Sequence, residues 1–328
     1  MGTALITGGA GFVGLNLAEA LLARGDQVVI FGRDAPPAAA SRHFATLPGR
    51  LTVTQGDVRD RAALATLFRA QPVDLLFPFA AITAGPAREA ADPHSIIDVN
   101  LNAVVATLEA ARDAGGVRRV ILPSSAAVYG EAVFTHPVLD EVTTPVAPIT
   151  VYGVTKFAVE RAGLRLAGAF GMSAVAARIG ATFGPWEHDT GLRDTLSAHH
   201  GVMQAVAAGR PALLPPLAAY DWLYVRDLAA GLLALADHPA PPHPVVNLGA
   251  GWDFAPHWLA AAQALATPFP GAEVRAAGRD EAPTIRLNET RPRGVMGVAR
   301  AADFGWAPRF TAASAYADWA GWLATFRS

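Results

Sequence analysis

The chain has 328 residues, of which 52% are hydrophobic and 16% are charged, and its formal net charge is −2. This composition supplies enough apolar side chains for a sizeable core, in one large domain or two smaller ones, and excludes a disordered chain. The slightly negative charge argues against a nucleic-acid-binding protein. The absence of cysteine excludes disulfides, thiolate metal sites and cysteine nucleophiles.

The start of the chain carries no targeting signal that we recognise. It lacks the basic segment of a signal peptide and runs directly into the apolar residues Ala4, Leu5 and Ile6. No uninterrupted apolar run reaches the roughly 18 to 20 residues that a membrane-spanning helix needs. We therefore expect a cytoplasmic protein.

A glycine-rich turn joins the first predicted strand, residues 3–6, to the first predicted helix, residues 15–23. Such a turn lets the backbone approach a pyrophosphate, which then sits on the N-terminus of the helix. A second predicted strand at residues 27–31 completes the strand–helix–strand pattern that raises this motif above a chance run of glycines. The turn predicts nucleotide binding by Gly8, Gly11, Phe12, Val13 and Gly14.

The end of the second predicted strand bears on which cofactor is bound. NAD-binding proteins usually have an acidic residue there, which accepts hydrogen bonds from the adenosine ribose. This chain has Gly32 at that place and Arg33 next, and a guanidinium can pair with a 2′-phosphate. The pattern favours NADP, while the neighbouring Asp34 keeps NAD possible and Arg33 could be an ordinary loop charge.

Further strands are predicted at residues 51–54, 73–79 and 119–122, with helices between them, including a long one over residues 93–114. This alternation predicts an α/β fold, a doubly wound parallel sheet of the Rossmann type, which binds ligands at the carboxyl ends of its strands. At that edge, Asp57 and Val58 would face the adenine, although Asp57 could instead cap a helix. The small residues Ala80 and Ala81 would leave room for the cofactor.

The chain contains a single lysine, Lys156, among 26 basic residues. It follows Tyr152 by four residues, a spacing that places both side chains on one face of a helix. A cation beside a phenol is expected to lower the tyrosine pKa from about 10 toward the range of a general acid/base. The alternative is a chance match on a solvated helix.

Taken together, these motifs resemble the extended short-chain dehydrogenases/reductases, of the NAD-dependent epimerase/dehydratase type. The matching pieces, in order, are Thr7-Gly8-x-x-Gly11-x-x-Gly14, Gly56-Asp57-Val58, Asn100, Ser124-Ser125 before Val128-Tyr129-Gly130, Tyr152-x-x-x-Lys156, Arg178 to Gly184-Pro185, and Arg291-Pro292.

The resemblance implies a catalytic set of three side chains. Tyr152 would be the acid/base, Lys156 would hold the nicotinamide ribose, and Ser125 would hydrogen-bond the reacting oxygen. Asn100 would lie by the cofactor and hold the helix backbone, or be only a polar kink. The resemblance also implies a homodimer formed through the helices of Asn100 and Tyr152.

Two departures from the family pattern narrow the function. The acid and base of the family's 4,6-dehydratases are replaced by Ala126 and Ala127, so dehydration is not expected. Two groups that typically grip the diphosphate of a nucleotide sugar are replaced by Ala181 and Tyr220. Losing two polar contacts to a pyrophosphate is costly, and this favours a substrate without the nucleotide, although Arg193, Arg286 or Arg291 could replace them.

The second half predicts a smaller C-terminal α+β substrate lobe, made of residues 184–221 and 251–328. The dinucleotide-binding domain would comprise residues 1–183 and about 222–250, with the segment 222–225 and a helix over 227–236 returning to the main sheet. The lobe would have Trp252, Trp258, Trp306, Trp319 and Trp322 in its core. Candidate substrate residues are Ser125, Arg178, Arg193, Tyr220 and Arg291.

Arg193 could pair with a substrate carboxylate, or with Asp189 or Asp194 on the surface. The spacing of the histidines predicts no metal site.

We interpret the sequence as an oxidoreductase that transfers a hydride between NADP, or NAD, and a hydroxyl-bearing carbon of a sugar or sugar acid. One alternative is a nucleotide-sugar epimerase that keeps its cofactor bound. Another is a cofactor-binding sensor without chemistry, which the combination of Ser125, Tyr152 and Lys156 disfavours.

Overall fold

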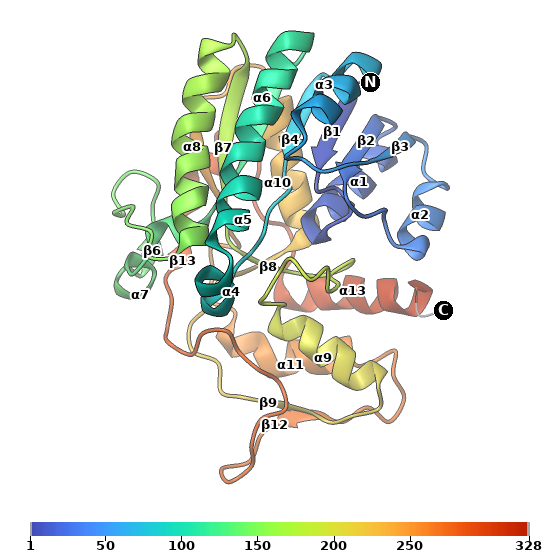
Figure 1. Cartoon of the computed structure of the whole chain (residues 1–328). Helices are drawn as coiled ribbons and strands as arrows, with labels where there is room; N and C mark the ends of the chain where they lie inside the picture. Colours follow the sequence, from blue (N-terminus) through green and yellow to red (C-terminus); the bar gives the residue numbers. More distant parts are fainter. Residues whose placement is uncertain (1, 327–328) are drawn as a thin grey trace.

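The centre of the molecule is a seven-stranded parallel sheet in the order β11-β7-β5-β4-β1-β2-β3 (Figure 1). A computed structural model describes residues 2–326. The strands of the sheet are β1 (Thr3–Thr7), β2 (Gln27–Gly32), β3 (Arg50–Gln55), β4 (Leu75–Pro78), β5 (Arg119–Ser125), β7 (Ser173–Ile179) and β11 (Val245–Leu248). The predicted doubly wound parallel sheet is confirmed.

Helices cover both faces of the sheet because alternate strand residues point to opposite sides. On β1, Ala4 and Ile6 pack into one core with α1 (Phe12–Ala23), α2 (Ala38–Phe44) and α10 (Val225–Asp237). Leu5 packs into another core with α3 (Arg61–Ala70), α6 (Ala103–Ala114) and α8 (Val151–Ala169), the three helices in front in Figure 1.

The helix predicted over residues 93–114 is present, but it is not one regular α-helix. It consists of α5 (Pro93–Ile97), a π-helical turn over Asp98–Asn102, and α6. Asn100 lies in the π turn and is fully buried. Such a turn inside a helix commonly lies near a functional site.

Below the sheet in Figure 1 lies a lobe built from small two-stranded sheets and helices. Its elements are β8 (Ala181–Phe183), β9 (Ala212–Leu214), β10 (Trp222–Tyr224), β12 (Val274–Ala276), α9 (Ala198–Ala207), a 3₁₀ turn (Ala255–His257), α11 (Trp258–Leu265) and α13 (Ala312–Phe326). The prediction that residues 222–225 return to the main sheet is wrong. The strand β10 pairs with β8 instead, although α10 does pack on the sheet as expected.

Aromatic side chains form the core of this lobe. Trp258 and Trp319 are buried there with Tyr316 and Phe254. Trp306 departs from the prediction, because it packs against α10 in the core beside the main sheet and donates its indole N–H to the Asp227 carbonyl. Trp252 and Trp322 touch both cores.

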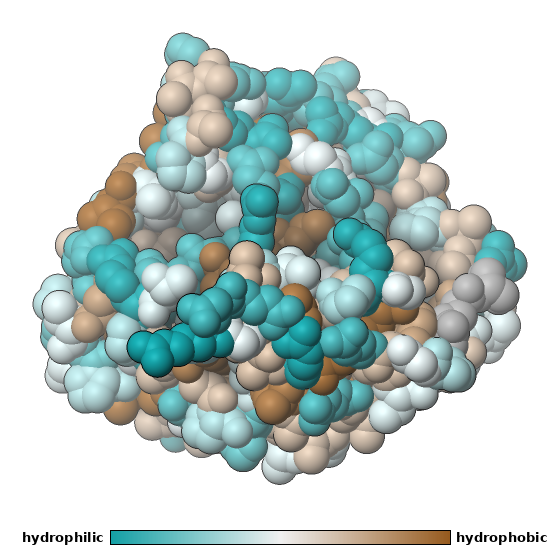
Figure 2. Space-filling view, turned by 90° about the horizontal axis from the view of Figure 1, so that it is seen from below, coloured by the Kyte–Doolittle hydropathy of each residue, from teal (hydrophilic) through white to brown (hydrophobic). Residues whose placement is uncertain are grey.

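The remaining elements are short. They are α4 (Pro86–Ala91), a 3₁₀ turn (Ala126–Tyr129), α7 (Ala132–Thr135), β6 (Val138–Leu139), β13 (Val295–Met296) and α12 (Ala299–Ala302). From the lobe side, hydrophilic and hydrophobic residues are interspersed in small areas (Figure 2). Among residues 2–326, the helices are too short or too polar to cross a bilayer.

Candidate active site

A continuous cavity of about 1070 Å³ runs along the carboxyl ends of the sheet strands and into the lobe. At one end it is lined by the glycine-rich turn after β1 and by the ends of β2 and β3. In the middle it passes Ser125, Tyr152 and Lys156, and at the other end it reaches Tyr220, Trp222 and Arg293. Single small-molecule pockets commonly measure about 300 to 1,000 Å³, so this cavity is at the large end of that range.

The glycine-rich turn has the shape of a phosphate cradle. Gly8 has a φ of +66°, and a Cβ atom at this position would lie 2.6 Å from the Ala80 Cα. Gly11 precedes α1 without a side-chain cap, so the first backbone N–H groups of the helix, at Phe12 and Val13, are available to a ligand. The turn and the helix dipole therefore fit the diphosphate of a dinucleotide cofactor.

The end of the cavity near β2 and β3 carries two arginines, Arg33 and Arg59, whose guanidinium groups differ in their partners. Asp57 accepts hydrogen bonds from the backbone N–H and the guanidinium of Arg59, which hold the pKa of Asp57 below its usual value. Arg33 is exposed, and its guanidinium donates no hydrogen bond to any side chain that the structure describes. The cap of α3 is Asp60, so the alternative role of Asp57 as a helix cap is wrong.

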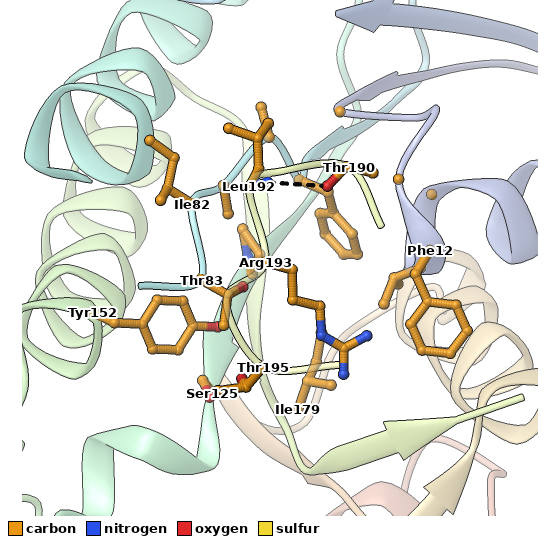
Figure 3. Close-up of a pocket in the computed structure, with 18 of the residues that line it drawn as sticks. Phe12, Ile82, Thr83, Ser125, Tyr152, Ile179, Thr190, Leu192, Arg193 and Thr195 are labelled. Carbon is orange, nitrogen blue, oxygen red and sulfur yellow. Dashed lines mark hydrogen bonds between the residues drawn. The ribbon is translucent and has the colours of Figure 1, made fainter. Parts of the chain in front are cut away.

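Tyr152 projects from the first turn of α8 toward Ser125 and Thr83 (Figure 3). Thr150 caps this helix by accepting from the Gly153 N–H at 3.0 Å. A Cβ at Gly153 would lie 2.8 Å from the Ala127 carbonyl, so glycine lets α8 approach the turn that carries Ser125.

Burial raises the pKa of Tyr152, while the hydroxyls of Ser125 and Thr83 and the charge of Arg193 oppose the rise. The sequence-based expectation that Lys156 lowers this pKa is wrong for the structure. The Lys156 ammonium lies 5.5 Å from the centroid of the tyrosine ring, toward its face. The cation that acts on the phenol is Arg193, which the sequence did not connect with Tyr152.

Lys156 is 3% exposed, yet its ammonium has no hydrogen-bond or ion-pair partner among residues 2–326. Burial lowers its pKa to about 8, so it is still mostly protonated at neutral pH. A buried cation without a partner is costly. Its position in the cavity wall indicates that a polar ligand group meets it there.

Residues 187–195 form a strap across the middle of the cavity and are pinned to the loop that follows β4. The backbone of Thr83 donates to the Leu192 carbonyl at 2.8 Å and accepts from the Asp194 N–H at 3.0 Å. Asp194 also pairs with Arg88 on α4. These contacts hold the strap in place and bring Arg193 into the cavity wall.

Arg193 pairs with Glu187 rather than with Asp189 or Asp194, the surface partners considered from the sequence. Its Nη1 atom lies 2.9 Å from Oε1 of Glu187, whose side chain is fully buried. Glu187 also accepts from the backbone N–H and hydroxyl of Ser197, the residue that caps α9.

Arg178 is not available to a substrate. Its guanidinium makes two hydrogen bonds to Glu160 and one to the Tyr129 hydroxyl, which in turn donates to Asn247. Arg178 is 4% exposed and does not line the cavity. The expectation of a substrate contact is therefore corrected to a role in packing beneath the site.

Asn100 and Arg291 also lie outside the cavity lining. The Asn100 side chain exchanges two hydrogen bonds with the Ile82 backbone and donates to Thr155, so it fixes the loop after β4 against α8. Arg291 is exposed and pairs with Glu131 and Glu289. Arg293, two residues later, does line the cavity, and it donates to the Tyr220 hydroxyl at 2.8 Å.

The other sequence-predicted residues share the cavity wall. They are Gly8, Gly11, Phe12, Val13, Gly14, Arg33, Asp57, Val58, Ala80, Ala81, Ser125, Tyr152, Lys156, Arg193 and Tyr220. Sequence reasoning missed Thr83, Thr195 and Arg293. Thr83 follows the small residues after β4 and could have been suspected from that position. Arg293 lies only two residues after Arg291, and the sequence does not indicate which of the two faces the cavity.

Comparison with known proteins agrees with this arrangement. The profile of the NAD-dependent epimerase/dehydratase family matches residues 4–249. The chain belongs to this family. It is therefore an NAD(P)-dependent enzyme of the extended short-chain dehydrogenase/reductase class, as the motifs indicated.

Curated members of the family include both epimerases and dehydrogenases. The chain is 30% identical to a UDP-glucose 4-epimerase of Streptomyces lividans, over 94% of this chain and 92% of that protein. It is 29% identical to a dTDP-6-deoxy-L-talose 4-dehydrogenase (NAD(P)(+)) of Kitasatospora kifunensis, over 75% and 73% of the two chains.

Among solved structures, the UDP-glucose 4-epimerase of Bifidobacterium longum in complex with NAD+ and UDP matches with a TM-score of 0.77. The identity is 24%, and the match covers 98% of each chain. At this identity the likeness shows that the two family members share a fold.

Proposed function

We propose that this protein is a nucleotide-sugar epimerase that oxidises and re-reduces a carbinol carbon with a bound nicotinamide cofactor. The observation that carries the proposal is the single cavity that joins the glycine-rich turn, Tyr152 and Arg293. A cofactor on the turn would place its reactive end near Tyr152, and the remaining space toward Arg293 suits an extended substrate. The full-length similarity to a UDP-glucose 4-epimerase supports the same function.

The structure weakens one argument for the sequence-based expectation that the substrate carries no nucleotide. That preference rested on Ala181 and Tyr220, which lack the polar groups that typically grip a diphosphate. The Arg293 guanidinium lies 5.1 Å from the Tyr220 ring centroid and lines the cavity, so a cation is present near that position. A guanidinium can bind a diphosphate through paired hydrogen bonds.

The proposed chemistry assigns a separate task to each central side chain. A bound nicotinamide cofactor supplies the hydride acceptor for oxidation of the carbinol. Tyr152 takes the hydroxyl proton and returns it when the carbonyl is reduced again, and Ser125 hydrogen-bonds the reacting oxygen. Lys156 holds the nicotinamide ribose. The lobe that contains β8, β9, β10, α9, α11 and α13 binds the substrate in this proposal.

A net dehydrogenase acting on a sugar or sugar acid is the second candidate. Ala181 favours it, because no side-chain amide is available at that position of the cavity. The similarity to a dTDP-sugar 4-dehydrogenase shows that the family includes net oxidation. In either case we propose a preference for NADP over NAD, which rests on Gly32 and Arg33.

We also propose a homodimer formed through α5 and α8. Ile97 and Val154 are 40% and 51% exposed on these two helices, which pack against each other. Exposed apolar side chains on neighbouring elements favour an interface with a second chain.

The test is a product analysis with matched substrates. Purified enzyme is incubated with NAD or NADP and with UDP-glucose, UDP-glucuronate or the corresponding free sugars, and the products are separated by chromatography. Formation of the 4-epimer without net cofactor reduction is the expected result. Tyr152→Phe is expected to lower turnover about 100- to 10,000-fold, because the proton relay is lost, while cofactor binding remains.

Stoichiometric formation of reduced cofactor without an epimer would instead support the second candidate. Turnover that persists in Tyr152→Phe would overturn the mechanism in both forms. Thr325→Val, on the exposed side of α13, is the control for the loss of a hydroxyl far from the cavity.

A further inference from the structure

The strap over the cavity carries an arginine with donors to spare. Arg193 enters from the edge that pairs with Thr83, and its guanidinium extends into the cavity between Phe12 and the Tyr152 hydroxyl (Figure 3). Its side chain is 25% exposed, and its guanidinium carbon lies 5.3 Å from the Phe12 ring centroid. It therefore faces space that a ligand would fill.

Only part of this guanidinium is satisfied by the protein. An arginine has five N–H donors, and the ion-pair contact of Arg193 is that of Nη1 with Glu187 at 2.9 Å. The Nε and Nη2 groups donate to no atom of residues 2–326. Arg178, which is also paired with a glutamate, instead uses Nε, Nη1 and Nη2 on protein acceptors. The difference points to a ligand acceptor at Arg193.

The position of Arg193 restricts what that acceptor is. The Arg193 guanidinium and the Tyr152 hydroxyl point into the same part of the cavity (Figure 3), so a group bound to the guanidinium lies near the reacting hydroxyl. The diphosphate of a nucleotide sugar has Arg293 at the other end of the cavity. The diphosphate of the cofactor has the N-terminus of α1. An anion that belongs near the reacting carbon is a carboxylate on the sugar ring.

Building on the proposed function, we propose that Arg193 binds a sugar carboxylate and that the substrate is a uronic acid, carried on a nucleotide. The planar guanidinium matches a carboxylate through two parallel hydrogen bonds. Glu187 holds Nη1 and so directs the free edge of the guanidinium into the cavity. Thr83 and Thr195, which also line this part of the wall, supply hydroxyl partners for the ring.

The experiment compares ligands that differ only in the carboxylate. Binding of UDP-glucuronate and UDP-glucose is measured by calorimetry with the cofactor kept reduced, so that no substrate is oxidised. Free glucuronate and glucose form a second pair. Wild type is expected to bind each acid about 10- to 100-fold more tightly than its neutral partner, as one charge-assisted hydrogen-bond pair allows.

Arg193→Met is expected to abolish this difference while the affinity for UDP-glucose stays within about twofold, since the neutral sugar does not use the pair. Arg193→Lys should retain part of it, because the charge remains and the fork is lost. The matched control is Arg275→Met, which removes an exposed arginine paired with two glutamates far from the cavity and should change neither affinity.

Several outcomes would overturn the assignment. If Arg193→Met weakened the binding of both sugars equally, or weakened only the binding of the reduced cofactor, Arg193 would contact a group other than the sugar carboxylate. Epimerisation of UDP-glucose that is independent of Arg193, with no preference for the acid, would sink this inference and leave the proposed function standing. Arg193-dependent binding of free glucuronate without binding of either nucleotide sugar would leave the carboxylate contact standing, but it would overturn the proposed function and the nucleotide part of this inference.

Discussion

Two buried glutamates in this protein each hold an arginine, and the two pairs lie in different surroundings. Glu160 and Arg178 lie beneath the carboxyl ends of the sheet, where both side chains are almost fully covered. Glu187 and Arg193 lie in the strap over the cavity, where the glutamate is buried and the arginine is partly open. Both pairs satisfy the glutamate, but only the first also satisfies the arginine.

The difference shows how the same residue types can serve packing or binding. Around Arg178, the Tyr129 hydroxyl and Ser124 complete a closed network that leads through Asn247 to the neighbouring strand. Such a network is strong only while every member is present. Around Arg193, the network ends at the cavity. By the count of unused donors, Arg178 is satisfied within the fold and Arg193 is left open toward the cavity.

Breaking the closed network should give the largest effect on stability. Arg178→Met leaves Glu160 buried without its ion pair, and removing one partner of a buried pair typically costs about 3 to 5 kcal/mol. We expect the free energy of unfolding, measured by urea denaturation, to fall by that amount, while turnover per folded molecule stays near wild type.

Arg275→Met serves as the exposed control for this change, since a surface pair contributes at most about 1 kcal/mol. A selective loss of substrate affinity in Arg178→Met, with stability unchanged, would contradict the separation of the two arginines.

Changing the pair of Glu187 and Arg193 should lower the free energy of unfolding by less, and it should shift the pH dependence of activity. Glu187→Gln keeps an acceptor for Ser197 but loses the carboxylate charge that pairs with Arg193 and accepts from Ser197, and hydrogen bonds to charged groups contribute about 1.5 to 3 kcal/mol. The charge of Arg193 then acts on Tyr152 without an opposing carboxylate. Because this charge lowers the pKa of Tyr152, the rising limb of the pH–activity profile should move to lower pH.

The measurement is the pH dependence of kcat/KM for the epimerisation, alongside urea denaturation. A stability loss as large as that of Arg178→Met, with an unmoved pH profile, would mean that Glu187 only supports the cap of α9.

The same contrast explains which features could be predicted from sequence. The glycine-rich turn and the pair of Tyr152 and Lys156 were predicted from spacing within one strand–helix unit or one helix, and Ser125 from the family motif; the structure places them along one cavity. The hydrogen bond of Arg178 with Tyr129 joins residues that are 49 positions apart in the sequence. The pairing of Glu187 with Arg193 depends on the shape of the irregular strap, which no sequence periodicity predicts. The lowered pKa expected for Tyr152 was wrong for the same reason, since spacing brought Lys156 near the ring but not to its oxygen.

The lobe was predicted only in outline. Its aromatic content was evident, but β10 pairs with β8 rather than with the main sheet, and Trp306 packs on the other side of α10. Short strands of three residues carry too little pattern to specify a partner. Asn100 was recognised by its motif, while its actual bonds to Ile82 and Thr155 required the fold.

A third arginine extends the comparison to the cofactor. Arg33 is exposed and donates to no described side chain, whereas its neighbour in space, Arg59, is occupied by Asp57. By the count of free donors, Arg33 is the one available to a 2′-phosphate.

Arg33→Ala should therefore weaken NADPH binding about tenfold, the effect of losing one charge-assisted contact, and leave NADH affinity nearly unchanged. Titration of intrinsic tryptophan fluorescence with each cofactor gives both constants, and Arg59→Ala is the matched control. Equal losses for the two cofactors, or a larger effect of Arg59→Ala on NADPH, would show that Arg33 does not select the phosphate and that Asp57 and Arg59 deserve the assignment instead.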